Sequence, residues 1–320
     1  MEETLVQRSN QGIDPEFFVW GWDVAGYLFL GGLVAGLLIL TGLWMRRAGA
    51  RSAMPASIRW GTVAAPLMLG AGMLLLFLDL DLKVHVLRFY TAFHPTSPMS
   101  WGSWILVLVF PLMAVLALVL APDRIRALLL GCRALGRLAT LGERWWGRIA
   151  TIAIVAGAGL GIYTGILLGA SVARPLWSSA ALGPLFLASG TSGAAALLAL
   201  VERDGAVRSW LARADIWALA AEILLIGAFL VGHATSTRCH IEAIGMLLGG
   251  PFTGAFWGLV VVGGVGVPIL LEWLELRGRV IATAAVPLLV LAGGIALRYV
   301  ILAAGQASGV GGDAPLNTFF

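Results

Sequence analysis

Apolar residues along this chain gather into eight runs of about twenty, separated by short polar connectors. Runs of that length match a helix crossing a hydrocarbon core about 30 Å thick at 1.5 Å rise per residue. We therefore predict an all-α polytopic membrane protein with about eight transmembrane helices in two packed bundles. The predicted spans are Val19–Met45, Gly61–Leu80, Gly102–Leu120, Ile149–Ala170, Ala180–Val201, Ile216–Gly232, Phe252–Leu271 and Val280–Ala304.

Composition excludes a soluble protein of this length. Hydrophobic residues make up 59% and charged residues 12%, whereas soluble domains carry about 25% charged residues. The first residues, Met1 to Phe18, are acidic and polar, which argues against a cleaved signal peptide. We attribute the net charge of +4 to membrane topology and expect no nucleic-acid partner, because the basic residues lie in the connectors.

Arginine placement predicts the orientation. With the N-terminus outside, the inner connectors hold 15 of the 21 basic residues, and the reverse orientation would invert a strong bias. Both termini are therefore expected on the extracytoplasmic side. The longest inner connector, residues 123–148, carries arginines at intervals of seven and four, which indicates an amphipathic helix on the cytoplasmic leaflet. The alternative is a solvated basic loop. The connector's repeating arginines are Arg126, Arg133, Arg137, Arg144 and Arg148.

Ionisable and phenolic side chains inside a span are candidates for function, because they are costly in a bilayer unless paired or hydrated. Asp23 and Tyr27 lie one turn apart in the first span, Tyr163 lies in the fourth and Arg298 in the eighth, all in the outer third. Asp79 ends the second span on that side. Together they can hold a lipid-soluble molecule with two polar oxygens. Singly, the tyrosines also fit interfacial aromatics, Asp23 a helix N-terminal charge, and Arg298 a snorkelling cation or an ion-pair partner.

Two acids lie toward the inner side. Glu222 in the sixth span is interpreted either as a proton-relay residue or as the partner of a polar group on another helix, whereas Glu272 at a helix end is interpreted as an interfacial charge.

No metal or haem site is expected. The two cysteines, Cys132 and Cys239, have no CxxC spacing, which excludes an iron–sulfur cluster bound by this chain. The four histidines do not form the matched pair that a b-type haem requires. The Arg238–Glu242 segment lacks a second pair of histidine or cysteine ligands.

Five segments resemble the NrfD/PsrC family, the membrane subunits of polysulfide-reductase-like respiratory complexes, and the resemblance spans nearly the whole chain as a single domain, residues 1–320. The run FHPTSPMSWGSW is the most specific. The segments are Trp20–Gly32 (WGWDVAGYLFLGG), Asp79–Lys83 (DLDLK), Phe93–Trp104 (FHPTSPMSWGSW), Gly254–Trp257 with Pro268 and Glu272, and Leu297–Val300 with Ala304–Gln306.

The resemblance implies a subunit of an inner-membrane oxidoreductase that binds menaquinone or ubiquinone near the extracytoplasmic face and carries no redox centre of its own. Electrons would pass between the quinone and a ferredoxin-like partner with four [4Fe-4S] clusters, which serves a catalytic subunit, commonly a molybdopterin enzyme. In the best-studied branch an amide and a histidine on the first helix and a tyrosine on the fourth contact the quinone. Here Asp23, Tyr27 and Tyr163 take those places, and Asp79 matches the acid that ends the second helix.

The working hypothesis is quinone chemistry at the outer face, with Tyr27 and Tyr163 orienting the quinone oxygens, Asp23 and Asp79 exchanging protons, and Glu222 starting an inner proton path. Two alternatives remain: a secondary transporter or channel, and a passive membrane anchor. The transporter has less support because no pair of interrupted helices occurs at corresponding positions of two halves.

Overall fold

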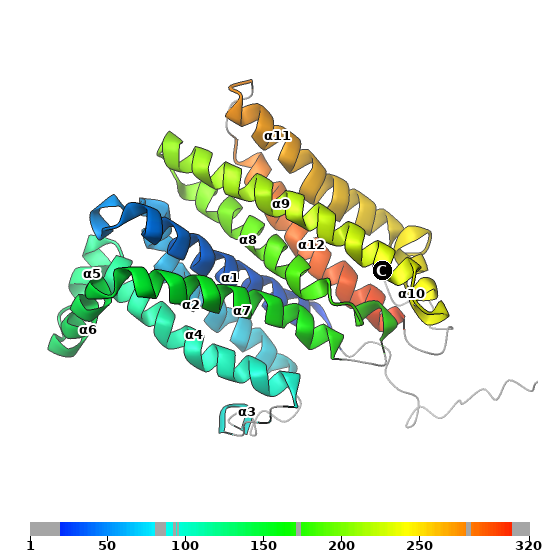
Figure 1. The fold of residues 1–320 in the computed structure, drawn as a ribbon, viewed down its shortest axis with the longest axis horizontal. Helices are drawn as coiled ribbons and strands as arrows, with labels where there is room; N and C mark the ends of the chain where they lie inside the picture. Colours follow the sequence, from blue (N-terminus) through cyan, green and yellow to red (C-terminus); the bar gives the residue numbers. More distant parts are fainter. Residues whose placement is uncertain are drawn as a thin grey trace, which may run out of the picture.

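The computed structural model describes residues 20–80, 88–91, 94, 96–170, 174–279 and 283–308. This part of the chain is all helical, as predicted, and contains eight helices long and apolar enough to cross a membrane (Figure 1). The chain is therefore a multi-pass membrane protein. Its spanning helices are α1 (Trp22–Ala48), α2 (Ala56–Asp79), α4 (Pro98–Leu120), α7 (Trp146–Gly169), α8 (Leu182–Val201), α9 (Gly205–Ala234), η4 (Ala255–Gly266) running into α11 (Val267–Leu276), and α12 (Ala285–Ala307).

The helices form two bundles that meet where α1 packs against α8. One bundle packs α1 against α2 and α7, with α4 on the outside; the other packs α8 against α9 and α12, with η4 and α11 completing it. Glycines allow the two bundles to meet closely: a β-carbon on Gly36 of α1 would lie 2.4 Å from the Gly190 carbonyl oxygen of α8. Small residues at such contacts are typical of membrane helix packing.

Short elements occupy the two ends of the bundles. The connectors around residues 49–55, 121–145, 202–204 and 277–279 form what we call the basic end, at the left and top in Figure 1; α10 lies at the opposite end. The short elements are η1 (Arg51–Ala53), α3 (Arg88–Thr91), α5 (Asp123–Leu129), α6 (Arg133–Arg144), η3 (Pro175–Trp177) and α10 (Arg238–Leu248). The terminal segments, and with them the expected position of both termini, lie outside the described residues.

Two arginines close the C-terminal end of α4. Arg51 donates to the Val119 and Ala121 carbonyls at 3.0 and 2.9 Å, and Arg59 donates to the Leu120 and Ala121 carbonyls, both at 3.2 Å. Carbonyls at a helix C-terminus have no intrahelical donor, so these cations satisfy them and complement the helix dipole. Asp123 joins both guanidinium groups at 2.7 and 3.0 Å, and their hydrogen bonds hold the pKa of this exposed carboxyl below its ordinary value.

The sixth span differs most from its prediction. It begins at Gly205 rather than at Ile216, because Asp204 caps the helix by accepting hydrogen bonds from the Ala206 and Val207 amides at 2.7 and 3.2 Å. The extra turns place Asp215 well inside the helix. The seventh span likewise continues past Leu271 to Leu276, so that Glu272 is 4% exposed. The interpretation of Glu272 as an interfacial charge was therefore wrong.

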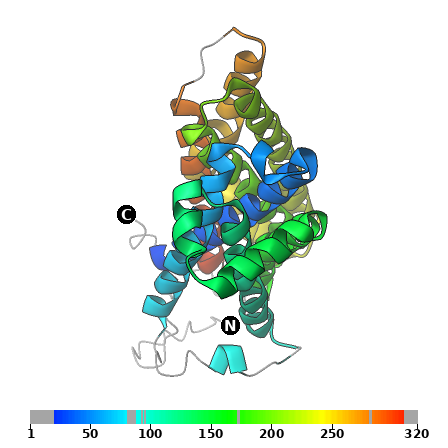
Figure 2. The same ribbon diagram turned by 90° about the vertical axis from the view of Figure 1, so that its left-hand side faces the viewer.

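The 123–148 connector folds as two helices, α5 and α6, where a single amphipathic helix was expected. The break falls at Leu130–Cys132, and the two helices form a hairpin beside α4 (Figure 2).

Candidate functional site

Tyr27 on α1 has polar neighbours on two other helices, at the end of the first bundle that lies opposite the basic end. The half-buried Tyr27 phenol on α1 lies within electrostatic range of the Tyr163 phenol on α7 and of the Asp79 carboxyl that ends α2. Tyr27 reaches this position because its backbone packs on Gly72 of α2, where a β-carbon would lie 3.7 Å from the Tyr27 Cα. Two phenols and an acid can therefore act on one small polar molecule.

The Tyr163 phenol is seated on α4 by the absence of a side chain at Gly102. A β-carbon built on Gly102 would lie 2.0 Å from the phenol oxygen and 2.1 Å from the carbon that carries it. Neighbouring serines fix this end of α4: Ser100 accepts from the His94 amide at 2.9 Å, and the Ser103 hydroxyl donates to the Ser100 carbonyl at 2.8 Å. The SWGSW motif therefore includes the platform for Tyr163.

The side chain of Asp23 is more exposed than those of Tyr27, Asp79 and Tyr163. It occupies the first turn of α1, one turn before Tyr27, and its side chain is exposed. Beside it, the exposed Trp22 stacks on Tyr299 of α12 with ring centroids 4.0 Å apart. Asp23 thus stands between the tyrosine cluster and the surface of the opposite end.

Arg298 was expected to lie with the tyrosines, but its guanidinium is fully buried in the second bundle. Its guanidinium donates to the Ser189 hydroxyl at 2.7 Å, to the Gly294 carbonyl at 2.9 Å and to the Phe186 carbonyl at 3.0 Å. Glu222 on α9, 3% exposed, interacts electrostatically with Arg298 and contacts Ser189. A buried acid and a buried base therefore compensate each other across α8, α9 and α12.

A second set of buried polar side chains lies nearer the basic end. Ser192, one turn after Ser189, donates to Asp215 Oδ1 at 2.5 Å, and the Asp215 carboxyl also interacts with that of Glu272 on α11. Asp215 Oδ2 and Glu272 Oε2 are buried and have no hydrogen-bond partner within the described residues. A proton shared between the two carboxyl groups would satisfy these oxygens, because two carboxyl groups form a hydrogen bond only when a proton lies between them.

The two buried groups form a line toward the basic end. Asp215 and Glu222 are seven residues apart on one face of α9, about 10 Å along its axis. One turn beyond Glu272, Glu275 pairs with Arg208 at 3.3 Å, and both side chains are partly exposed. Sequence reasoning missed Asp215 because it set the start of the span at Ile216; the Asp204–Gly205 cap was the signal that could have corrected it.

Helix α1 separates this polar line from the tyrosine cluster. Arg298 lies against α1 at Gly32, where a β-carbon would be 2.8 Å from a guanidinium nitrogen. Gly32 follows Tyr27 by five residues, which is about 140° around a helix with 3.6 residues per turn. The two groups therefore face different bundles.

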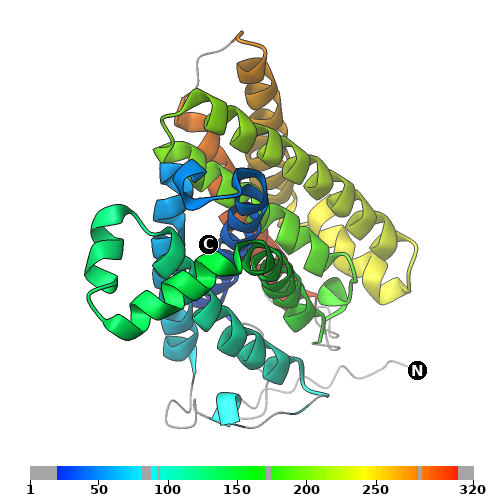
Figure 3. The same cartoon turned by 60° about the vertical axis from the view of Figure 1, so that its left-hand side comes forward.

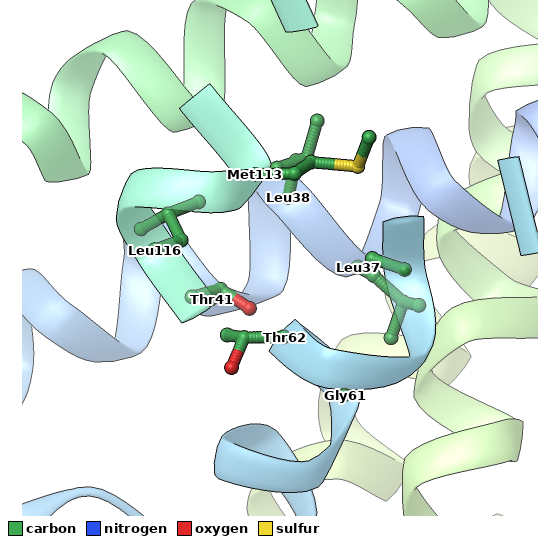
Figure 4. A pocket seen from close by; sticks show the side chains of 8 residues that line it. Leu37, Leu38, Thr41, Gly61, Thr62, Met113 and Leu116 are labelled. Carbon is green, nitrogen blue, oxygen red and sulfur yellow. The ribbon is translucent and has the colours of Figure 1, made fainter. Parts of the chain in front are cut away.

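A small cavity between α1, α2 and α4 does not belong to either group (Figure 4). Its lining is mostly apolar, with the hydroxyls of Thr41 and Thr62, and its volume is about 10 Å³. That is enough for about one water molecule and far below the ~300–1,000 Å³ of typical small-molecule sites.

The described residues contain no group of three or more His, Cys, Asp and Glu side chains placed to hold a metal ion. In the segment weighed as a metal site, Arg238 pairs with Glu242 at 3.0 Å, His240 contacts the Thr237 hydroxyl at 2.7 Å, and Cys239 is exposed.

Comparison with known proteins agrees with this architecture. The family model "Polysulphide reductase, NrfD" matches residues 11–310. The C subunit of polysulfide reductase from Wolinella succinogenes is 32% identical over 90% of this protein and 94% of its own length. Protein NrfD of Escherichia coli is 33% identical over 91% and 96%, and the NrfD homologue of Haemophilus influenzae is 27% identical over 90% and 94%. This chain belongs to the NrfD family of polysulfide-reductase-type membrane subunits.

Proposed function

We propose that this chain is the quinone-reactive membrane subunit of a respiratory oxidoreductase complex in the cytoplasmic membrane, with its basic end in the cytoplasm. Quinone or quinol binds at the tyrosine cluster near the extracytoplasmic face. The observation that carries the proposal is the placement of Tyr163 on Gly102, with Tyr27 within electrostatic range of both Tyr163 and Asp79. The basic connectors support the orientation.

The cluster suits a quinone because the two phenols can each donate a hydrogen bond to a quinone oxygen or accept one from a quinol hydroxyl. Oxidation of a quinol releases two electrons and two protons. Asp79 beside Tyr27 and the exposed Asp23 one turn further out are placed to take up those protons and pass them to the extracytoplasmic surface. Quinone reduction uses the same groups in the opposite direction.

The electrons go to or come from a partner. Cys132 and Cys239 are both exposed and far apart in sequence, so they do not provide the four ligands that an iron–sulfur cluster needs. We infer a ferredoxin-like subunit with four [4Fe-4S] clusters, followed by a catalytic subunit that carries molybdopterin. The name of the Wolinella relative, which is one lettered subunit of polysulfide reductase, supports a multi-subunit enzyme. Exposed apolar side chains near the cluster provide a docking surface: Trp22 (62% exposed), Met99 (53%) and Trp101 (51%).

The buried polar line in the second bundle supports proton transfer from the cytoplasmic side. Its members lead from Arg208 and Glu275 at the basic end, through the Asp215–Glu272 pair, to Glu222 and Arg298 in the bundle interior. Buried acids linked by hydroxyls can take up and release a proton where a lone buried carboxylate would be costly. Glu222→Gln should therefore reduce the number of protons taken up per quinol turned over by the assembled complex in oriented liposomes, and an unchanged ratio would remove Glu222 from the route.

The same polar line would serve a secondary transporter or channel, and the docking surface would serve a passive anchor. The test compares Tyr163→Phe and Asp23→Asn with Tyr299→Phe, which also removes one phenol hydroxyl but keeps the stacking on Trp22. We expect the first two variants to lose quinol-linked turnover while the complex still assembles. The Tyr299 variant should keep it. Equal turnover in all three would favour the anchor or the transporter.

A further inference from the structure

The α5–α6 hairpin presents arginines that nothing else in the described chain neutralises. Residues 123–148 contain six arginines, two acids and no lysine. Both acids are already paired, Asp123 with Arg51 and Arg59, and Glu143 with Arg126 at 2.5 Å. The five remaining arginines have exposed side chains and form no ion pair within the described residues: Arg124, Arg133, Arg137, Arg144 and Arg148.

The hairpin is a fixed part of the fold. Gly142 of α6 packs so closely on α4 that a β-carbon there would lie 2.4 Å from a Val119 methyl group, and Ala139 beside it is buried. Arg126 ties α5 to both neighbours, because it pairs with Glu143 of α6 and donates to the Leu118 carbonyl of α4 at 3.3 Å. Figure 3 shows the hairpin projecting sideways from the first bundle at the basic end.

The exposed surface of α6 is divided into two faces. At 100° per residue, Arg133, Arg137 and Arg144 fall within about 40° of one another. Next to them, and before the packed face, come Leu138 and Leu141, which are 45% and 53% exposed. An arginine face beside an exposed leucine face is the pattern of a helix lying in the plane of a membrane surface.

The flanks of α6 continue this pattern. Leu128 of α5 is 82% exposed, and Trp145 after α6 is 51% exposed with the Arg148 guanidinium 5.0 Å from its ring centroid. Tryptophan and arginine pairs of this kind suit the interface between lipid tails and headgroups.

We propose that the α5–α6 hairpin binds anionic phospholipids of the leaflet at the basic end, with Arg133, Arg137 and Arg144 on the phosphate groups and Leu138 and Leu141 among the acyl chains. The guanidinium group favours this ligand, because its planar set of donors matches two phosphate oxygens at once. Attraction to anionic lipid is worth about 1 kcal/mol for each nearby arginine. Loss of the three arginines should therefore weaken lipid binding about a hundredfold.

The test uses the purified complex with the full-length protein, stripped of lipid in detergent, and follows its melting temperature with added phosphatidylglycerol or phosphatidylcholine. One variant carries Arg133→Gln, Arg137→Gln and Arg144→Gln. The matched control carries Arg203→Gln, Arg213→Gln and Arg279→Gln, which removes three exposed arginines from the basic end of the second bundle. A third variant carries Arg133→Lys, Arg137→Lys and Arg144→Lys, which keeps the charge and should keep most of the effect.

The proposal predicts that phosphatidylglycerol raises the melting temperature more than phosphatidylcholine does, that the hairpin variant loses this gain, and that the control keeps it. Three results would overturn it: equal stabilisation by both lipids, an unchanged gain in the hairpin variant, or an equal gain from inorganic phosphate, which would indicate a free-anion site. Loss of a partner subunit from the hairpin variant, with its phosphatidylglycerol gain intact, would instead identify a protein-docking surface.

Discussion

The phenol of Tyr163 on α7 rests on the backbone of Gly102 on α4, and the space between them is too small for a methyl group. This contact connects two parts of the sequence that are sixty residues apart. It explains why the segment SPMSWGSW contains a glycine in the first turns of a membrane helix, where glycine has no advantage of its own.

Replacing Gly102 with alanine should therefore displace the Tyr163 hydroxyl. Because a shift of about 1 Å in a positioning group can cost about a hundredfold in rate, we expect a loss of that order in kcat/KM for quinol in the assembled complex. The control is Gly159→Ala on α7, whose added methyl group would meet open space. Full activity in Gly102→Ala would contradict the role of this contact.

Removing one member of the Arg298–Glu222 pair should destabilise the fold. Glu222→Gln removes the carboxyl that interacts electrostatically with the fully buried Arg298 guanidinium, and couplings within one buried network are about 0.5–3 kcal/mol. The double variant Glu222→Gln, Arg298→Gln should recover part of that stability. The measurement is a double-mutant cycle by thermal or denaturant unfolding in detergent. Additive effects of the two substitutions would show that the residues do not compensate each other.

Glu272→Gln should separate stability from proton transfer. The glutamine amide can donate to the Asp215 carboxyl, whose Oδ2 atom has no partner within the described residues, so the interaction is retained with little loss of stability. The amide cannot release a proton, and proton uptake in liposomes should fall on the order of a hundredfold. Glu275→Gln, one turn closer to the surface, is the control and should have a smaller effect. Normal uptake in Glu272→Gln would exclude the pair from the route.

The ion pairs of Asp123 with Arg51 and Arg59 should make stability depend on pH in the acid range. Hydrogen bonds from Arg51 and Arg59 lower the pKa of Asp123 in the folded protein. Its contribution is therefore complete above the ordinary value of 3.8 and is lost as the pH falls through the folded value. Asp123→Asn should lower the melting temperature at pH 7, and the two proteins should converge as the pH falls below 3.8. A difference in melting temperature that persists unchanged in acid would mean that the carboxylate charge does not contribute to stability here.

Most of the fold could be predicted because a bilayer imposes a length on each apolar run. All eight spans were identified, and the largest error, at the start of α9, arose where polar residues lie inside a helix. Asp215 was left outside the predicted span and Glu272 was placed at a span end, because hydropathy alone cannot distinguish a polar residue that ends a span from one that is buried in it.

The sites were less predictable than the spans. Tyr27, Tyr163 and Asp79 could be grouped by depth, and in the structure Tyr27 lies within electrostatic range of the other two. Depth does not report the direction a side chain faces around its helix, so Arg298 was grouped with them although it contacts Ser189 in the second bundle. The platform at Gly102 could not be inferred at all, because its function is the absence of a side chain.

Photolabelling with a quinone that carries a reactive azide, followed by mass spectrometry of the labelled peptides, locates the quinone site in the assembled complex. We expect label on the segments of α1, α2, α4 and α7 around Tyr27, Asp79, Gly102 and Tyr163. We also expect that an excess of unlabelled quinone and the Tyr163→Phe substitution each reduce that labelling. Label confined to the second bundle, or spread without competition, would contradict a quinone site at the tyrosine cluster.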